Sequence, residues 1–356
     1  QPLQNLAEME EIQKQAKKNR GILEISGCME SQKAHLMYGL SGLFPCHLVI
    51  AADEKSAKEL YEDYRFYDKR VYYYPAKDLL FFQADIHGNL LIRQRMQVIR
   101  ALLEREDEIT VVTSIDGCMD YLAPLEKIEK QLIHFRNDST LDMDKLTAAL
   151  VHMGYERVGQ VEMPGQFSIR GGIIDIYSLT EENPWRIELW GDEIDSIRSF
   201  DAQSQRSLEN LDDVTIYPAA EQPMEKNGVS FLDYFKETET LFFLDELNHL
   251  EENAKAVQEE FQQSCENRKE KGEISLSGDW INDRNCVAMS LLDPKKSNWK
   301  ISGQFNITVK SMSSYQSSFE LLVKDLKQYK KEGYQIVLLS GSRTRAERLA
   351  KDLQEE

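Results

Sequence analysis

The sequence predicts an α/β protein in which a parallel, helicase-like sheet is interrupted by an inserted α+β domain rich in antiparallel strands. Short apolar or β-branched runs first alternate with helical stretches of about 10–15 residues, which is typical of βαβ units. A block of short strands follows, at about residues 128–218, with Gly, Pro, Asn or Asp at its junctions. The alternation then resumes, so the first domain is completed after the insertion.

The first domain is expected over residues 1–127. A surface helix lies within the first ~20 residues, where apolar positions recur at helical spacing. The expected strands are GILEIS, HLVIAA, VYYYP and ITVVTSI. The helices expected after them are ESQKAHLMYGLSGLF, EKSAKELYEDYRFY, IRQRMQVIRALLERE and a short one around CMDYL.

The inserted domain is expected over residues 128–218. It opens with the helix LDMDKLTAALVHMG and continues with the strands ERVGQVEM, GQFSIRG, GIIDIYS, PWRIELW, DEIDSIRSFD and DDVTIYP. Residues 219–303 then complete the first domain, with the strand TLFFLDE, the helix LEENAKAVQEEFQQSCENRKEK and a loop-rich stretch at about 273–300.

Residues 304–356 are expected to begin a further small α/β domain. NITVK and YQIVLLS are its expected strands, each followed by a helix. Two strands and two helices cannot close a doubly wound sheet, so we expect the sequence to be part of a longer protein.

The composition narrows the possible partners. The 356 residues contain 43 Lys and Arg against 61 Asp and Glu, a net charge of −18. Such a chain lacks the overall basic character of proteins that mainly bind nucleic acid, although a local basic patch remains possible. No apolar stretch approaches the ~18 residues of a membrane span. Five scattered cysteines without C-x-x-C spacing, and six histidines without ligand spacing, indicate a cytoplasmic protein without a metal site.

The turn after GILEIS occupies the place of a phosphate-binding loop. Such a loop needs G-x-x-x-x-G-K-[ST], whose lysine reaches the phosphates. On the interpretation favoured here, only Gly27 and Ser31 remain of the motif, and Glu30 takes the place of the lysine, where it repels phosphate. Lys33 lies too far along the helix to substitute easily. The sequence therefore predicts a degenerate, inactive nucleotide site.

Asp245 and Glu246 end the apolar run TLFFL. An acidic pair at a strand tip holds Mg²⁺ in many NTPases. Without a phosphate loop, the favoured interpretation is that both carboxylates belong to the start of the next helix, where they suit its dipole.

The inserted domain contains the most informative surface. Alternation in PWRIELW places Arg186 and Trp190 on the face opposite the core, and Arg170 of GQFSIRG also points outward. Arg and Trp are enriched at interface hot spots. The alternative interpretation is a structural role for this face, in which the arginines pair with Glu188 or Asp192 and Trp190 covers the sheet edge. Because the face is expected to be exposed, alanine substitutions there should barely change the melting temperature.

GQFSIRGGIIDIY, PWRIELWGDEIDSIRSFDAQSQRS and DDVTIYPAAE together resemble the bacterial transcription-repair coupling factor family (Mfd), in the module that this family shares with UvrB. NLLIRQRMQVIRALLEREDEITVVTS resembles both families. The resemblance spans most of the chain: domains 1a, 2 and 1b and the start of the next domain. UvrB itself has an intact phosphate loop and a tyrosine-rich hairpin, for which the roughly 20 residues between Tyr74 and Arg93 leave no room.

The resemblance implies that domain 2 binds UvrA and thereby recruits it to stalled RNA polymerase in transcription-coupled nucleotide excision repair. Family contact positions fall on Arg170, Arg186 and Trp190, the last being a phenyl ring elsewhere. The resemblance implies no enzymatic activity and no cofactor for residues 1–356. ATP, Mg²⁺, RNA polymerase and double-stranded DNA would bind regions beyond Glu356, and a C-terminal region would mask the UvrA face. No membrane partner is expected. The alternative is a UvrB-like, nucleotide-dependent damage-recognition or helicase subunit that binds ATP near Gly27.

Overall fold

The fold is given by a computed structural model. It describes residues 1–356 except 1–2, 4–5, 7, 19, 78–84, 106–107, 120, 221–227, 269–280, 282, 294–296, 308–314, 316–317, 339, 341 and 356, and only the backbone of 85–89, 121 and 260–268. The chain forms two compact units, Gln1–Thr308 and Val309–Glu356.

The first unit is built on a seven-stranded sheet in the order β17-β1-β16-β15-β2-β4-β3, and every neighbouring pair in it is parallel. Strands β1, β4 and β15 are buried along their whole length, as expected for a parallel sheet covered on both faces. The predicted parallel α/β sheet is confirmed. Its strands are β1 (Gly21–Ser26), β2 (Cys46–Ala51), β3 (Val71–Tyr74), β4 (Ile109–Ser114), β15 (Thr240–Asp245), β16 (Asn285–Ser290) and β17 (Ile301–Asn306).

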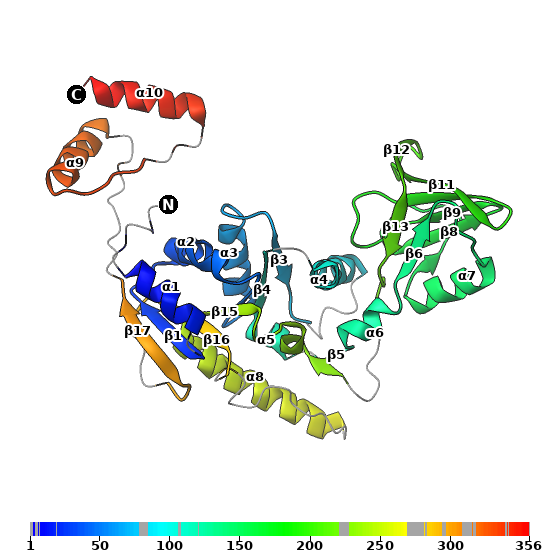
Figure 1. Ribbon diagram of the computed structural model, residues 1–356, viewed down its shortest axis with the longest axis horizontal. Coiled ribbons are helices and arrows are strands. Elements are labelled where there is room, and N and C mark those ends of the chain that lie inside the picture. Colours follow the sequence, from blue (N-terminus) through cyan, green and yellow to red (C-terminus); the bar gives the residue numbers. More distant parts are fainter. Residues whose placement is uncertain are drawn as a thin grey trace. The chain divides into compact units, whose positions relative to one another are not determined.

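Helices cover both faces of this sheet (Figure 1). On one face, α4 (Asp85–Glu104), α5 (Ile115–Cys118) and α8 (Leu247–Arg268) share an apolar cluster with the strands. The other side has α1 (Met9–Lys18), α2 (Glu30–Leu40) and α3 (Glu54–Tyr64). The remaining short elements are η2 (Ser41–Leu43), β5 (Tyr121–Leu122), α6 (Leu125–Glu129), β14 (Val229–Ser230) and η3 (Phe231–Tyr234).

The expected loop-rich stretch at 273–300 instead contains a central strand. β16 lies between β1 and β15 and is buried. The sequence NCVAMS is short, has polar ends and is flanked by Ser, Asn and Asp, so its composition resembles a loop. Its role as a strand is set by the two neighbours that supply hydrogen bonds on either side. Residues 273–280, 282 and 294–296 of this stretch lie outside the described part.

A further domain is expected from residue 304, and the second unit begins at Val309, within NITVK. β17 ends at Asn306 and pairs with β1, so it forms the edge of the first sheet; residues 308–310 are not described. In the second unit, α9 (Phe319–Lys331) and α10 (Arg343–Gln354) form as expected. YQIVLLS forms no strand in its described residues, 334–338 and 340. A strand needs a neighbouring strand to complete its hydrogen bonds, and the described residues of this unit include no second strand.

The inserted domain is built on a second, separate sheet within the first unit. Its six-stranded sheet has the order β12-β11-β10-β9-β8-β7 and is antiparallel except for the β7–β8 pair. Helix α7 (Met143–His152) packs on one face through Leu146 and Leu150. The strands are β7 (Glu156–Arg157), β8 (Gln166–Arg170), β9 (Ile173–Ile176), β10 (Trp185–Trp190), β11 (Glu193–Phe200) and β12 (Ser207–Leu211), beside a pair formed by β6 (Ile133–Arg136) and β13 (Asp213–Ile216).

A substitution at Gly27 tests the close contact between the turn after β1 and the backbone that follows β17. Its φ is +80°, and a Cβ there would lie 2.0 Å from the carbonyl oxygen of Ile307. We predict that Gly27→Ala lowers the free energy of unfolding by at least about 2 kcal/mol, since it adds left-handed strain to a backbone clash. Urea denaturation measures the change. The matched control is Gly42→Ala, where a Cβ meets nothing within 4 Å. Equal stability of the two variants would contradict this account.

Candidate functional site

The turn after β1 is closed by neighbouring backbone. The amide of Cys28 donates to the carbonyl oxygen of Ser290 at 3.0 Å, and the amide of Ile307 donates to that of Ser26 at 2.9 Å. The Ile307 carbonyl covers Gly27. A phosphate-binding loop instead directs its amides toward the ligand. At this turn, the Cys28 amide is committed to the neighbouring strand.

Lys33 fills the space beside this turn. Its Nζ lies 2.6 Å from Oδ1 of Asp245 and 2.6 Å from Oε1 of Glu246, and its side chain is 5 % exposed. The expectations that Glu30 takes the place of the phosphate-loop lysine and that Lys33 lies too far along the helix to substitute for it are wrong. Counted from Gly27, the lysine of G-x-x-x-x-G-K-[ST] falls on Lys33, while Gln32 and Ala34 stand where the motif has its second glycine and its hydroxyl residue. Burial alone would lower the pKa of Lys33, but the two adjacent carboxylates outweigh it and raise that pKa.

The acidic pair therefore has a partner that the sequence did not indicate. Asp245 is buried, and Glu246 also accepts the amide of Leu291 at 2.9 Å. Interpreting the two as helix-start carboxylates missed this internal cation. Glu30 and Ser31 are exposed at the start of α2. Burial raises the pKa of the nearby Cys28 thiol to about 11, so it stays protonated at neutral pH and is a poor nucleophile.

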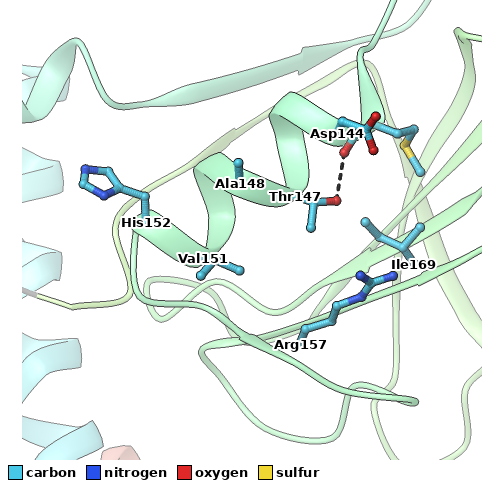
Figure 2. A pocket seen from close by; sticks show the side chains of 8 residues that line it. Asp144, Thr147, Ala148, Val151, His152, Arg157 and Ile169 are labelled. Carbon is cyan, nitrogen blue, oxygen red and sulfur yellow. Dashed lines mark hydrogen bonds between the residues drawn. The ribbon is translucent and has the colours of Figure 1, made fainter.

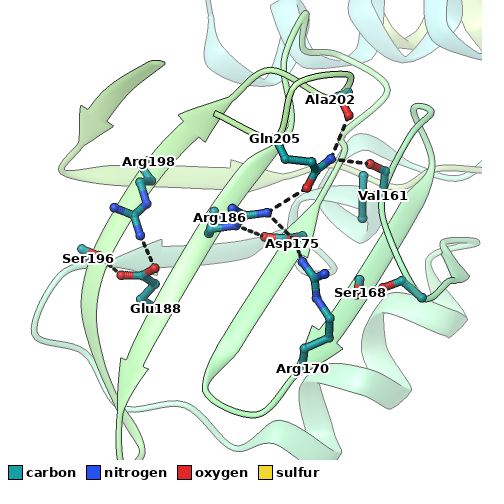
Figure 3. Close-up of polar contacts among 11 residues, drawn as sticks. Val161, Ser168, Arg170, Asp175, Arg186, Glu188, Ser196, Arg198, Ala202 and Gln205 are labelled. Carbon is teal, nitrogen blue, oxygen red and sulfur yellow. Dashed lines mark hydrogen bonds and ion pairs between the residues drawn. The ribbon is translucent and has the colours of Figure 1, made fainter. Parts of the chain in front are cut away.

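The outer face of the inserted sheet brings the two predicted arginines together (Figure 3). Arg186 donates from Nε to Oδ1 of Asp175 at 2.7 Å and from Nη2 to Oδ2 at 2.9 Å. Arg170 donates from Nη2 to the same Oδ2 at 2.6 Å. Asp175 is directly opposite Arg186 across the β9–β10 pair. We name this face, with Arg170, Asp175, Arg186, Glu188, Trp190, Arg198, Phe200 and Gln205, the arginine face.

Exposure differs among the three predicted residues. The exposed fraction is 15 % for the Arg186 side chain, 47 % for Arg170 and 84 % for Trp190. The Arg186 guanidinium lies over the Phe200 ring, 4.4 Å from its centroid. Its hydrogen bonds to Asp175 raise its pKa. The expectation that substitution leaves stability unchanged therefore fails for Arg186 and is kept for Trp190.

Three polar residues of this face were not predicted from the sequence: Asp175, Arg198 and Gln205. Asp175 could have been found by alternation in GIIDIY, where it faces away from the two flanking isoleucines. Arg198 could not, because a β-bulge shifts the β10–β11 register between Glu188 and Leu189. The bulge changes the phase of β11, so Ile194 and Ile197 are both buried and Arg198 turns outward to pair with Glu188. The alternative pairing of Arg186 with Glu188 or Asp192 is wrong, because its carboxylate partner is Asp175.

A groove of about 670 Å³ lies on the α7 side of the same domain (Figure 2). Val151 and Ile169 contribute apolar walls, with Arg157 and His152 nearby. The Thr147 hydroxyl is not available to a ligand as a donor, because it donates to the Met143 carbonyl within the helix at 2.8 Å. None of the predicted binding residues lines this groove.

Known proteins resemble the chain in its inserted domain and beyond. The family model of the UvrB interaction domain matches residues 133–221, which span β6 to β13 and the arginine face. The transcription-repair-coupling factor of Bacillus subtilis (strain 168) is 29 % identical over 410 residues, covering 92 % of this chain and 35 % of that protein. This chain is thus similar to that transcription-repair-coupling factor over most of its length.

Other transcription-repair-coupling factors match about half of the chain. Those of Staphylococcus aureus (strain MRSA252) and Staphylococcus haemolyticus (strain JCSC1435) are each 35 % identical over 46 % of the chain and 14 % of their own length. The predicted resemblance is thus confirmed. The chain spans about a third of the length of the Bacillus subtilis relative.

Membrane-spanning helices and metal-binding clusters are both absent from the described residues. None of the described helices combines the length and apolar character that crossing a bilayer requires. Within the same residues, no three His, Cys, Asp or Glu side chains converge as metal ligands would.

The Lys33 ion pairs make a stability prediction. Lys33→Met should lower the free energy of unfolding by about 3 kcal/mol, because it leaves buried Asp245 without its cation. Since the folded-state pKa of Lys33 is raised, the wild-type advantage is complete below the ordinary value of 10.5 and is lost as pH rises through the folded value. Urea denaturation at pH 7, 9 and 11 measures both effects. The control is Lys55→Met, since the Lys55 side chain is 85 % exposed. A Lys33 variant as stable as this control would contradict the prediction.

Proposed function

We propose that this chain is the amino-terminal recruitment module of a transcription-repair coupling factor, and that its arginine face binds UvrA. The observation that supports this most is the placement of Arg170, Arg186 and Trp190 on one face of the domain that matches the UvrB interaction domain. In this function, the module brings UvrA to stalled RNA polymerase in transcription-coupled nucleotide excision repair, in the cytoplasm.

The chemistry of the face suits a protein partner. Three guanidinium groups, on Arg170, Arg186 and Arg198, stand against the two carboxylates of Asp175 and Glu188, which leaves one excess positive charge. Arginine can make two-point contacts with carboxylates, and an exposed indole offers rigid area to bury. An excess positive charge in a chain of net charge −18 gives this face a local preference for acidic surfaces.

We also propose that residues 1–356 neither bind nor hydrolyse ATP. The Lys33 cation is already held by Asp245 and Glu246, and the Ile307 carbonyl lies against the turn at Gly27. ATP and Mg²⁺, RNA polymerase and double-stranded DNA are assigned to other regions of the longer protein. A C-terminal region of that protein is proposed to mask the arginine face.

Substitutions at two residues of the arginine face should affect UvrA binding similarly but protein stability differently. Trp190→Ala should weaken UvrA binding by about 2 kcal/mol, or roughly 30-fold, with an unchanged melting temperature, because the indole is exposed. Arg186→Ala should weaken binding similarly and also lower the free energy of unfolding by about 2 kcal/mol, since it removes two hydrogen bonds to a buried carboxylate. Calorimetric titration with UvrA and urea denaturation measure the two effects.

The control for Trp190 is Phe66→Ala, which removes an aromatic ring that is 87 % exposed and lies outside the inserted domain. It should leave UvrA binding unchanged. If the Arg170, Arg186 and Trp190 triple alanine variant still binds UvrA like the wild type, the assigned face is wrong.

A nucleotide titration separates this proposal from a UvrB-like helicase subunit. With a fluorescent ATP analogue and Mg²⁺, we expect no saturable binding to this chain, while a nucleotide-binding UvrB serves as the positive control. Micromolar binding that is abolished by Ser31→Ala would favour the helicase alternative.

A further inference from the structure

We infer that Asp175 is a positioning residue, whose carboxylate holds Arg170 and Arg186 in the orientation in which they meet the partner. The inference rests on the proposed function of the arginine face. It assigns the order of this face to a buried acid that itself offers the partner almost no surface, because only 1 % of its side chain is exposed.

Both carboxylate oxygens of Asp175 are used by the arginines. Oδ1 accepts from Nε of Arg186, and Oδ2 accepts from Nη2 of Arg186 and from Nη2 of Arg170. β9 lies between β8 and β10, so one central acid reaches an arginine on either side. A carboxylate removed from water requires such partners, which makes the arrangement obligatory in the folded state.

Gln205 constrains Arg186 from another side (Figure 3). Its Oε1 accepts from Nη2 of Arg186 at 3.0 Å, while its Nε2 donates to the carbonyls of Ala202 at 2.7 Å and Val161 at 3.3 Å. Phe200 lies against the guanidinium as well. Arg186 is thereby fixed by three neighbours.

Arg170 is held differently. Only its Nη2 is engaged by Asp175, and its side chain is about half exposed. The contact orients the guanidinium plane while leaving other N–H groups directed away from Asp175. An arginine that is ordered before binding loses less side-chain entropy on association, so pre-ordering improves affinity.

Asp175→Asn tests the inference. An amide has one acceptor oxygen and places N–H donors where Oδ2 or Oδ1 accepted, so it cannot hold both guanidinium groups. We expect UvrA affinity to fall at least fivefold in Asp175→Asn. In an Arg170→Ala, Arg186→Ala background, the same substitution should cause no further loss of residual affinity, a dependence that general destabilisation would not produce.

The matched control is Ser168→Ala. Ser168 is buried directly opposite Asp175 across the β8–β9 pair, and its hydroxyl donates to the Gly159 carbonyl and not to the arginine cluster. Its affinity for UvrA should equal that of the wild type. All titrations are made where circular dichroism shows each variant to be folded.

If Asp175→Asn fails to fold, Gln205→Asn tests whether binding depends on Arg186 being held in position. The φ of residue 205 is +59°, which Asn tolerates well, and the shorter amide cannot reach Arg186. At least twofold weaker binding supports the inference, and unchanged binding overturns it. If the wild-type chain does not bind UvrA, or Trp190→Ala binds equally well, the proposed function itself fails. If both of those tests succeed and Asp175→Asn binds like the wild type, only the positioning role is wrong.

Discussion

A carboxylate that is removed from water must be paired with a cation, and both candidate sites of this chain are organised by that constraint. Beside the turn after β1, the buried Asp245 and its neighbour Glu246 share the single cation of Lys33, so negative charge is in excess. On the arginine face, the single buried acid Asp175 is shared by two guanidinium groups, so positive charge is in excess. The same pairing requirement therefore leaves excess negative charge beside the turn at Gly27 and excess positive charge on the sheet face.

Much of the fold could be predicted because the apolar residues of its strands and helices follow a local periodicity in the sequence. The buried runs of β1, β2, β4 and β15 are apolar over most of their length, and the alternation of β10 placed Arg186 and Trp190 on the outer face. The failures depend on non-local pairing. β16 is a strand because β1 and β15 flank it, whereas YQIVLLS has a strand-like composition but no neighbouring strand among the described residues of its unit.

The candidate site was predictable to a smaller extent, because its charges are paired across the fold. Lys33 and Asp245 are 212 residues apart in sequence, and only the parallel sheet brings their elements together. Asp175 is near Arg186 through strand register, which alternation alone does not give. Arg198 depended on a bulge in β11, and one extra residue reverses the face of every side chain that follows it.

The order of exposure from Arg186 through Arg170 to Trp190 implies a division of labour within one face. Arg186 is the structural end of the series, since its guanidinium is enclosed by Asp175, Gln205 and Phe200. Trp190 is the exposed end of the series, and under the proposed function its ring contacts the partner. A loss of binding on changing Arg186 can therefore arise from disorder of the face, while a loss on changing Trp190 reports the contact itself. The indole, which takes no part in the ion-pair cluster, is thus the more direct indicator of where a partner docks.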